Sequence, residues 1–440
     1  MLNENIAAIS TADGVGGVAI IRISGDSPVC VAKKIFAPSG KTPVEDFEPY
    51  RMYPGKILCD GFEDFGLCVY FKAPKSFTGE DVVELHCHGG SQIARGVLKA
   101  ALSNGARMAA NGEFSKRAFL NGKLSLASAE GLIDMINASS LAEVRAGNML
   151  YNEKLTEKVK ELQSELKDIL AGISADIDYP EEDVAATQLS DVDARLNAVD
   201  GRICTMIDSY DGGRKIKSGV TVALCGAPNA GKSSLLNALI GYDKAIVSPR
   251  AGTTRDAVEG VIQIDGVKYN LYDTAGIREH ADEIESAGIS IAKKIVASAD
   301  VIVYVCEGAY VPLEGVAEDD PRLIKVFNKC DVSSAGSDKF DISVSAKTSE
   351  NIQELKKLMS ARALGAHSLG SAYITEERHY EALCRASASL RNAVGAIGAF
   401  PLDIISLDIN DAWSALGEIT GETANEEIIS EVFAKFCVGK

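Results

Sequence analysis

The sequence predicts a multidomain protein of α/β and α+β class, in which a phosphate-loop α/β domain with a mainly parallel sheet is inserted into an α-helical domain. Three observations predict this fold. A glycine-rich loop lies between a strand pattern and a helix pattern, amphipathic helical patterns flank the α/β segment on both sides, and short apolar runs of strand length precede them. A chain of 440 residues is long enough for several such domains.

Composition limits the classes of protein to consider. The chain is 46% hydrophobic and 24% charged, and it has no apolar run near the about 20 residues of a membrane span and no basic N-terminal start, so we expect a cytoplasmic protein without membrane contact. Its ten cysteines include no C-x-x-C pair, which favours reduced thiols. A net charge of −17 disfavours general polyanion binding, so nucleic-acid contacts would use local patches.

The N-terminal region, residues 1–121, has mixed α and β patterns. Strands are predicted near residues 18–23 and 66–71, and a helix near residues 91–102. His86, Cys87 and His88 resemble a metal-binding group, but on a strand His86 and His88 share one face and Cys87 points to the other. A structural role is therefore the favoured interpretation.

Helical periodicity begins after Lys123 and returns near the C-terminus. Apolar residues recur every three or four positions in residues 128–137, 141–151, 155–177 and 192–210, and again in residues 375–396, 405–419 and 424–436. We therefore expect four segments: an N-terminal α+β domain at 1–121, a helical domain at 122–216, the inserted α/β domain at 217–365, and the rest of the helical domain at 366–440.

The phosphate loop lies between an apolar run at 220–224 and a helical run at 235–239. It reads Gly226-Ala-Pro-Asn-Ala-Gly-Lys-Ser-Ser and fits the pattern G-x-x-x-x-G-K-[ST]. Its glycines let the backbone wrap phosphates, Lys232 is expected to reach the β- and γ-phosphates, and Ser233 to hold Mg²⁺. The loop residues expected to contact the nucleotide are Gly226, Asn229, Ala230, Gly231, Lys232, Ser233 and Ser234.

Two later stretches match switch segments. Asp273-Thr-Ala-Gly276 follows a strand pattern, so Asp273 is expected to hold Mg²⁺ through water, and the Gly276 N–H to sense the γ-phosphate. Between this stretch and the phosphate loop lies Gly-Thr-Thr-Arg-Asp, in which Thr254, rather than Thr253, is the predicted Mg²⁺ ligand.

Two further stretches predict guanine specificity. Asp331 ends an Asn-Lys-Cys-Asp motif, and its carboxylate can accept from both the ring N–H and the 2-amino group of guanine, a pair that adenine lacks. The Ala346 N–H can donate to the 6-oxo oxygen. All five stretches in this order are typical of a GTPase, and the residues of these last two are Asn328, Lys329, Asp331, Ser345, Ala346 and Lys347.

Catalysis needs a group other than the glutamine that often follows the Asp-x-x-Gly motif, because Ile277 occupies that position. Asn229 could hold a monovalent cation where an arginine would otherwise act. A carboxylate of the following segment could instead orient water, and residue chemistry alone leaves open which one: Glu279, Asp282, Glu283 or Glu285.

These motifs and their layout resemble the tRNA-modification GTPase family called MnmE or TrmE along nearly the whole chain. The matching segments are residues 18–25, 76–84, 112–120, 226–234, 251–256, 418–421 and the C-terminal Phe-Cys-Val-Gly-Lys at 436–440. The resemblance implies an N-terminal domain that binds folate and dimerises. It also implies a homodimer whose GTPase domains pair when K⁺ and GTP are bound.

The resemblance also implies residue roles. Asn229 would be the K⁺ ligand, and Glu285 would orient the attacking water. A tetrahydrofolate derivative would contact Arg22, Glu84, Lys123 and Lys440. Cys437, which spacing alone would favour as a small buried hydrophobe, would serve the modification but not GTP hydrolysis. The implied partners are tRNA and an FAD protein of the MnmG type, with the reaction at C5 of the wobble uridine.

Two alternatives belong to other functional classes. A ribosome-assembly or RNA-binding GTPase would use the nucleotide only as a switch, and it predicts a basic RNA-binding appendage, which the sequence does not contain. A folate-dependent one-carbon transferase regulated by GTP would turn over folate without a partner protein.

Overall fold

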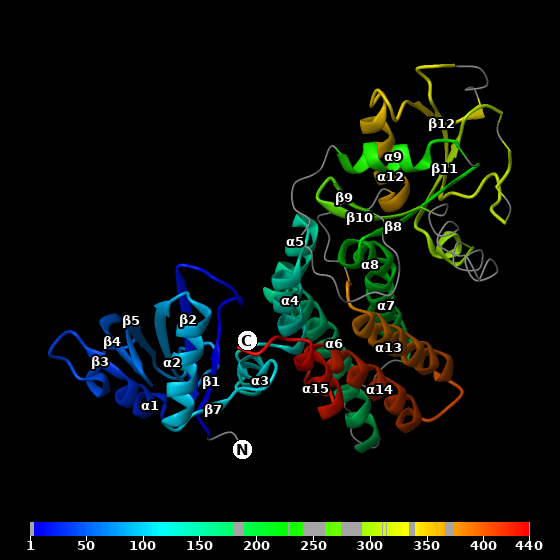
Figure 1. Ribbon diagram of the computed structural model, residues 1–440. Coiled ribbons are helices and arrows are strands. Elements are labelled where there is room, and N and C mark those ends of the chain that lie inside the picture. Colours follow the sequence, from blue (N-terminus) through cyan, green and yellow to red (C-terminus); the bar gives the residue numbers. More distant parts are fainter. Residues whose placement is uncertain are drawn as a thin grey trace, which may run out of the picture. The chain divides into compact units, whose positions relative to one another are not determined.

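A computed structural model describes residues 4–178, 189–227, 229–241, 260–273, 293–309, 311–313, 315–333, 339–365 and 374–439 (Figure 1). The chain forms two compact units. The first unit comprises residues 1–133, 149–197 and 388–440, and the second comprises residues 134–148 and 198–387. In the described residues, no helix has the length and apolar character needed to cross a membrane.

The first unit contains a seven-stranded sheet in the order β3-β4-β5-β6-β2-β1-β7. Every neighbouring pair is antiparallel except the parallel pair of β1 and β7. The strands are β1 (Ile6–Ile9), β2 (Val18–Gly25), β3 (Phe36–Pro38), β4 (Met52–Cys59), β5 (Phe62–Phe71), β6 (Asp81–His88) and β7 (Arg107–Met108).

Alternation of side chains gives this sheet one apolar face and one mixed face. Ile21 and Leu85 are fully buried against α1 (Pro28–Ile35) and α2 (Ser91–Ser103). Arg22 and Glu84, the chain neighbours of Ile21 and Leu85, point to the opposite face, as the two-residue period of a strand requires. The predicted strands and helix of this region are confirmed, with ends shifted by a few residues.

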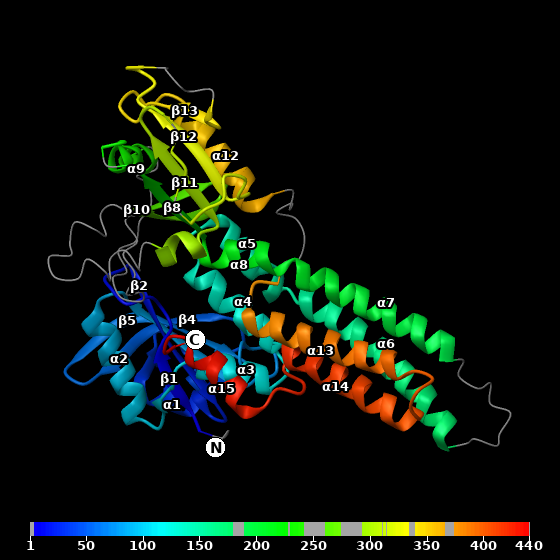
Figure 2. The same ribbon diagram turned by 90° about the vertical axis from the view of Figure 1, so that its right-hand side faces the viewer.

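Long helices complete the first unit. In α6 (Lys154–Asp178) the buried residues recur every three or four positions, and the helix packs along α14 (Leu402–Thr420). Figure 2 shows both as long helices of this unit. The C-terminal tail returns to the sheet, where Val438 bridges Asn111. The remaining helices of this unit are η1 (Val44–Asp46), α3 (Glu113–Leu120) and α15 (Glu426–Ala434).

Four helices contribute residues to both units, and a fifth lies in the second unit in addition to the helices of its sheet. The four are α4 (Leu126–Asn137), α5 (Leu141–Tyr151), α7 (Leu189–Asp208) and α13 (Glu377–Ala396), and the fifth is α8 (Tyr210–Ser218). The predicted helical segments are therefore all present, with ends that differ by a few residues.

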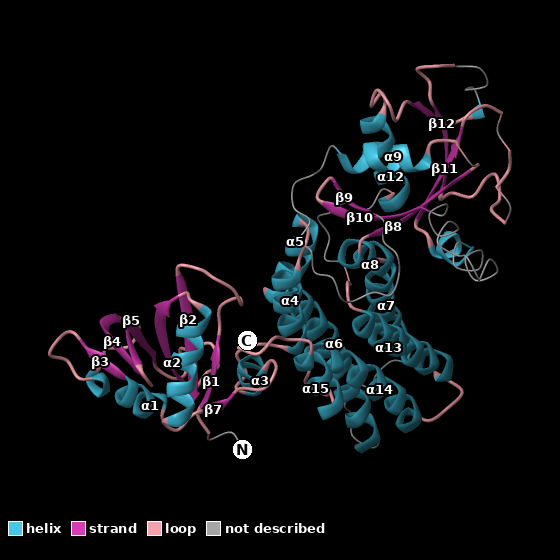
Figure 3. Ribbon diagram, viewed as in Figure 1, coloured by secondary structure: helices cyan, strands magenta, loops and turns pink. Residues whose placement is uncertain are grey.

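The second unit is built on a six-stranded sheet in the order β13-β12-β11-β8-β10-β9, drawn as magenta arrows in Figure 3. All pairs are parallel except β9 with β10, which confirms the predicted mainly parallel sheet. The strands are β8 (Val220–Gly226), β9 (Gly260–Ile264), β10 (Val267–Asp273), β11 (Val301–Cys306), β12 (Leu323–Asn328) and β13 (Ile342–Val344).

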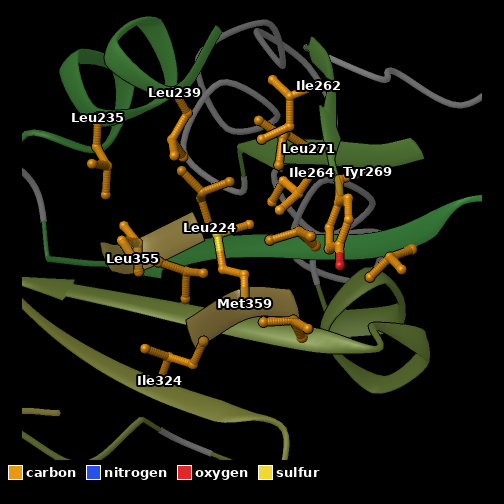
Figure 4. Close-up of a cluster of buried hydrophobic side chains, with 14 of the residues drawn as sticks. Leu224, Leu235, Leu239, Ile262, Ile264, Tyr269, Leu271, Ile324, Leu355 and Met359 are labelled. Atoms are coloured by element: carbon orange, nitrogen blue, oxygen red, sulfur yellow. The ribbon is translucent and has the colours of Figure 1, made fainter. Parts of the chain in front are cut away.

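An apolar core fixes this sheet against α9 (Lys232–Gly241) and α12 (Ile352–Leu364). Leu235 and Leu239 of α9, and Leu355 and Met359 of α12, pack on the same side of the sheet over Leu224 (Figure 4). Each of these side chains is fully buried. Because the strands are parallel, the loops that follow β8, β10, β11, β12 and β13 all leave the sheet at its carboxyl edge.

Candidate functional site

The phosphate loop leaves β8 through two glycines that no other residue could replace without strain. Gly226 has φ of 146°, and a Cβ there would lie 2.1 Å from the carbonyl oxygen of Val305 on β11. Gly231 has φ of 86°, and its Cβ would lie 2.4 Å from Nδ2 of Asn328. The loop is therefore held closely against the ends of two neighbouring strands.

Lys232 begins α9, and its ammonium turns back into the loop. Its Nζ donates to the carbonyls of Gly226 at 3.0 Å and Ala227 at 2.8 Å, and only 7% of the residue is exposed. The ammonium thus lies inside the loop that the sequence predicts to bind phosphate, next to the N-terminus of a helix. Both features favour an anion at this position.

Ser233 and Asp273 meet although 40 residues separate them in the chain. The Ser233 hydroxyl donates to Oδ2 of Asp273 at 3.1 Å, and Asp273, the last residue of β10, is 1% exposed. A hydroxyl and a carboxylate are the hard oxygen donors that Mg²⁺ prefers, so this pair fits the ion. The parallel pairing of β8 and β10 brings the two residues together.

Asn328 joins the base-binding segments to the phosphate loop. Its Nδ2 donates to the Ala230 carbonyl at 2.9 Å, and its Oδ1 accepts from the Ala346 N–H at 3.2 Å. Only 1% of the residue is exposed, and both ends of its amide are bonded within the protein, so the amide serves to hold the two loops in position. The sequence indicated that Asn328 belongs to the site, but not that it ties two loops together.

Asp331 is oriented by a buried hydroxyl. Ser345, fully buried, donates from Oγ to Oδ1 of Asp331 at 2.6 Å and accepts from the Thr348 N–H at 3.2 Å. The carboxylate predicted to select guanine is therefore held by a serine from the neighbouring strand end. This role of the serine hydroxyl was not predicted from the sequence.

The other predicted nucleotide residues lie on the same edge or outside the described residues. Asn229 has φ of 62°, and its carbonyl accepts from Lys329 Nζ at 3.3 Å, while Ser234 and Lys347 are exposed. The predicted residues outside the described residues are Thr253, Thr254, Gly276, Ile277, Glu279, Asp282, Glu283 and Glu285.

Glu307 is a site residue that sequence reasoning missed. It follows β11 directly, and its carboxylate forms an ion pair with Lys329. The sequence does contain a signal for Glu307, because it is a carboxylate at a strand end on the sheet edge that carries the nucleotide motifs. It belongs to none of those motifs, so reasoning from motifs did not select it.

A second cluster lies on the mixed face of the N-terminal sheet. Arg22 Nε donates to Oε1 of Glu84 at 2.8 Å, Nε2 of His86 lies 3.3 Å from Oε2, and the Arg22 guanidinium lies 5.3 Å from the ring centre of Phe77 and 5.7 Å from that of Phe114. Burial alone would raise the pKa of Glu84, but the hydrogen bond with His86 and the charge of Arg22 lower this pKa below its usual value.

The remaining predicted residues of the first unit are spread over loops. Lys123 Nζ donates to the Pro74 carbonyl at 3.1 Å, and Cys437 is exposed, so it is not the buried hydrophobe that spacing alone favoured. Gly439 accepts at its carbonyl from the Ser10 hydroxyl at 3.0 Å, which ties the tail beside β1. Lys440 lies outside the described residues.

The pair of histidines near this cluster is arranged as the strand period predicts. Cys87 is buried, whereas His88 is exposed and its Nδ1 lies 2.6 Å from Oδ1 of Asp64. Among the described residues, no group of three or more His, Cys, Asp and Glu side chains is arranged to hold a metal ion.

Comparison with known proteins covers the whole chain. The family described as the MnmE helical domain matches residues 126–437, and the family described as the GTP-binding protein TrmE N-terminus matches residues 5–123. Among solved structures, the G domain of the T. maritima FeoB iron transporter is 29% identical over 33% of this chain and 98% of that one, with a TM-score of 0.24.

Three curated relatives align along their full lengths, and each is named tRNA modification GTPase MnmE. The protein from Acetivibrio thermocellus is 37% identical over 99% of both chains. Those from Dechloromonas aromatica and Heliobacterium modesticaldum are 38% and 36% identical over 100% of both chains. Similarity of this extent, on a chain that folds its phosphate-loop and guanine motifs onto one sheet edge, shows that the protein belongs to the MnmE family of tRNA modification GTPases.

Proposed function

We propose that the chain is a K⁺-stimulated GTPase that works with an FAD protein of the MnmG type to form an aminomethyl-type group at C5 of the tRNA wobble uridine. A tetrahydrofolate derivative would supply the one-carbon unit. The observation that carries the GTPase part is the convergence of Lys232, the pair of Ser233 and Asp273, and Asp331 at the carboxyl edge of one sheet.

In this proposal the chain has four segments. Two copies of the chain form a homodimer in the cytoplasm. Residues 1–121 bind folate and dimerise, residues 122–216 and 366–440 form the helical domain, and residues 217–365 form the GTPase domain. GTP hydrolysis then follows when the GTPase domains of two copies pair. Full-length similarity to relatives named tRNA modification GTPase supports this organisation.

For hydrolysis, the phosphate loop stabilises the negative charge that develops on the phosphates. Lys232 exchanges its bonds to the Gly226 and Ala227 carbonyls for phosphate oxygens, so its charge is already in position. Ser233 and Asp273 would hold Mg²⁺, which would supply positive charge to offset that of the phosphates.

Guanine is selected by a carboxylate whose direction is set before the base arrives. Asp331 accepts from the ring N–H and the 2-amino group, while Ser345 keeps one of its oxygens in place. The Ala346 N–H, which donates to Oδ1 of Asn328, would donate to the 6-oxo oxygen when guanine is bound. Adenine offers neither donor pair nor oxo group, so ATP is rejected.

The attacking water is positioned without a glutamine. Asn229 would supply a side-chain amide oxygen for K⁺, a role that rests on the residue type and on the family resemblance. Glu285 orients the water, Thr254 closes on Mg²⁺, and the Gly276 N–H contacts the γ-phosphate. These last roles rest on the family resemblance.

The folate derivative is held on the mixed face of the N-terminal sheet. Glu84 offers a lowered-pKa carboxylate as an acceptor for the N–H groups of a pterin ring, and Arg22, Lys123 and Lys440 supply positive charge. When bound, the folate supplies the one-carbon unit. Cys437, exposed on the tail that docks beside β1, serves the modification reaction.

One experiment tests the biological part of the proposal. Wobble uridine from cells that lack this chain is analysed by mass spectrometry, and the cells are then complemented with the natural chain or with Lys232→Ala. We expect the C5 modification to disappear and to return only with the natural chain. Unchanged wobble uridine in the deleted strain would refute the tRNA role.

A second experiment tests the cation. GTP hydrolysis by the purified chain is measured in K⁺ and in Na⁺ at equal ionic strength, with Asn229→Ala as the comparison. We expect faster hydrolysis in K⁺ and no difference between the salts for the variant. Equal rates of the natural chain in both salts would exclude K⁺ stimulation.

A further inference from the structure

Glu307 is the first residue after β11, the strand that lies between β8 and β12 in the sheet. Its carboxylate therefore stands between the phosphate loop, which follows β8, and the Asn-Lys-Cys-Asp segment, which follows β12. It forms an ion pair with Lys329. The same Lys329 ammonium donates to the Asn229 carbonyl at 3.3 Å, so the three residues form a chain from one strand end to the phosphate loop.

Asn328, the last residue of β12, and Lys329, the next residue, hold two consecutive carbonyls of the phosphate loop. Asn328 donates to the Ala230 carbonyl at 2.9 Å, and Lys329 donates to the Asn229 carbonyl at 3.3 Å. In a planar trans peptide the N–H points away from the carbonyl of the same peptide. Anchoring these carbonyls outside the loop therefore turns the N–H groups of Ala230 and Gly231 away from the anchors.

The interior hydrogen bonding agrees with this orientation. The Ala230 N–H points into the loop and donates to the Ala227 carbonyl at 3.3 Å, the same carbonyl that accepts from Lys232. Asn229 itself adopts a left-handed conformation, with φ of 62°, which costs energy for a residue other than glycine. An external bond to its carbonyl helps to offset that cost.

We propose that Glu307 is a positioning residue of the GTPase site: by holding the Lys329 ammonium against the Asn229 carbonyl, it keeps the loop ready for the phosphates of GTP and for the cation at Asn229. The assignment rests on the proposed function. Lys329 has a long flexible side chain that is 38% exposed, and the carboxylate restricts the conformations it can adopt. Asn328, being buried, needs no such support.

The test measures equilibrium binding of a fluorescent GDP and GTP analogue, and the K⁺ concentration that gives half-maximal hydrolysis. For Glu307→Gln we expect about tenfold weaker nucleotide binding, the effect of losing one charge-assisted contact, and a higher half-maximal K⁺ concentration. Glu307→Asp should restore part of the affinity. Glu318→Gln, which changes an exposed carboxylate between β11 and β12, is the matched control and should bind as the natural chain does.

A double-mutant cycle separates positioning from a general structural role. If Glu307 acts through Lys329, then Glu307→Gln changes nothing further in a Lys329→Gln background. Because the ion pair is about half exposed, thermal unfolding should stay within a degree or two of the natural chain. Natural affinity in Glu307→Gln, or an undiminished effect in the Lys329→Gln background, would overturn the proposal. Failure of the natural chain to bind GTP would instead refute the proposed function.

Discussion

The nucleotide site and the Arg22 cluster place charged groups on sheets in two different ways. At the nucleotide site the side chains lie at or just beyond the carboxyl ends of parallel strands, and several of their partners are backbone carbonyls. At the N-terminal cluster, Arg22 and Glu84 face each other across two antiparallel strands in direct register. The first arrangement depends on local motifs, and the second depends on strand pairing.

This difference has an energetic consequence. At the nucleotide site the charged and polar side chains contact mainly backbone carbonyls and other polar groups, so a substitution there removes little apolar packing. A cross-strand ion pair, whose side chains are 21% and 12% exposed, is part of the packed sheet, and removing one partner leaves the other charge poorly solvated. We therefore expect substitutions at the first site to reduce activity more than stability, and substitutions at the second site to reduce both.

The largest effect is expected for Lys232→Ala. Removing the ammonium inside the loop should lower kcat for GTP hydrolysis by at least about 100-fold, as loss of a single transition-state contact does in other enzymes. Folate binding to the first unit should be unchanged. Single-turnover hydrolysis and folate titration on the same sample check both statements, and a loss of folate binding would break the contrast between the sites.

A slightly smaller effect is expected for Asp331→Asn, which exchanges an acceptor for an amide. GTP affinity should fall about 100-fold because two hydrogen bonds to a charged group are lost. Xanthosine triphosphate should bind better than it does to the natural chain, since its 2-oxo oxygen can accept from the new amide. Competition binding with the two nucleotides is the measurement, and unchanged base preference would contradict the role of Asp331.

At the N-terminal cluster, Glu84→Gln should lower the free energy of unfolding by about 1 to 2 kcal/mol, because the partly buried Arg22 guanidinium loses a charged acceptor. Folate binding should weaken, whereas GTP hydrolysis should not change. Urea unfolding gives the first quantity. Glu45→Gln is the matched control, because its ion pair with Lys33 is exposed and should contribute almost nothing.

The smallest effect is expected for a cluster of ion pairs in the second unit. Its pH dependence tests whether ion pairs between different elements contribute to stability in both units. Lys217, near the end of α8, lies 2.9 Å from Asp134 of α4 and also pairs with Glu376 beside α13. Burial, and then the charge of Glu376, raise the pKa of Asp134 to about 7, although Lys217 acts against this.

The sign of the pH dependence follows from this pKa. Between about pH 4 and pH 7 the folded protein holds a proton on Asp134 that the unfolded chain has lost, so the stabilisation from this group decreases as pH rises through about 7. Asp134→Asn should make the free energy of unfolding less dependent on pH in this range. Urea unfolding at several pH values measures this dependence. If the free energy of unfolding of the variant changes with pH as steeply as that of the natural chain, the proton is bound by a group other than Asp134.

Local sequence patterns were sufficient to predict most of the helices and strands that the sequence analysis names. The helix at residues 141–151 was predicted with its observed ends, and the helix predicted at 375–396 begins at Glu377. The gathering of Lys232, Ser233 and Asp331 at one sheet edge was also predictable, because each belongs to a motif that follows a strand of the parallel sheet. Helix ends were less certain, since capping depends on contacts that periodicity does not contain.

The sequence by itself determined which groups are present and in what order they leave the sheet. Only the tertiary structure decided that β11 lies between β8 and β12, and therefore that Glu307 meets Lys329 beside Asn229. It likewise paired Arg22 with Glu84 by strand register. The physical reason is that strand order and register follow from burying whole apolar faces, which involves residues far apart in the chain, whereas a motif needs only its neighbours.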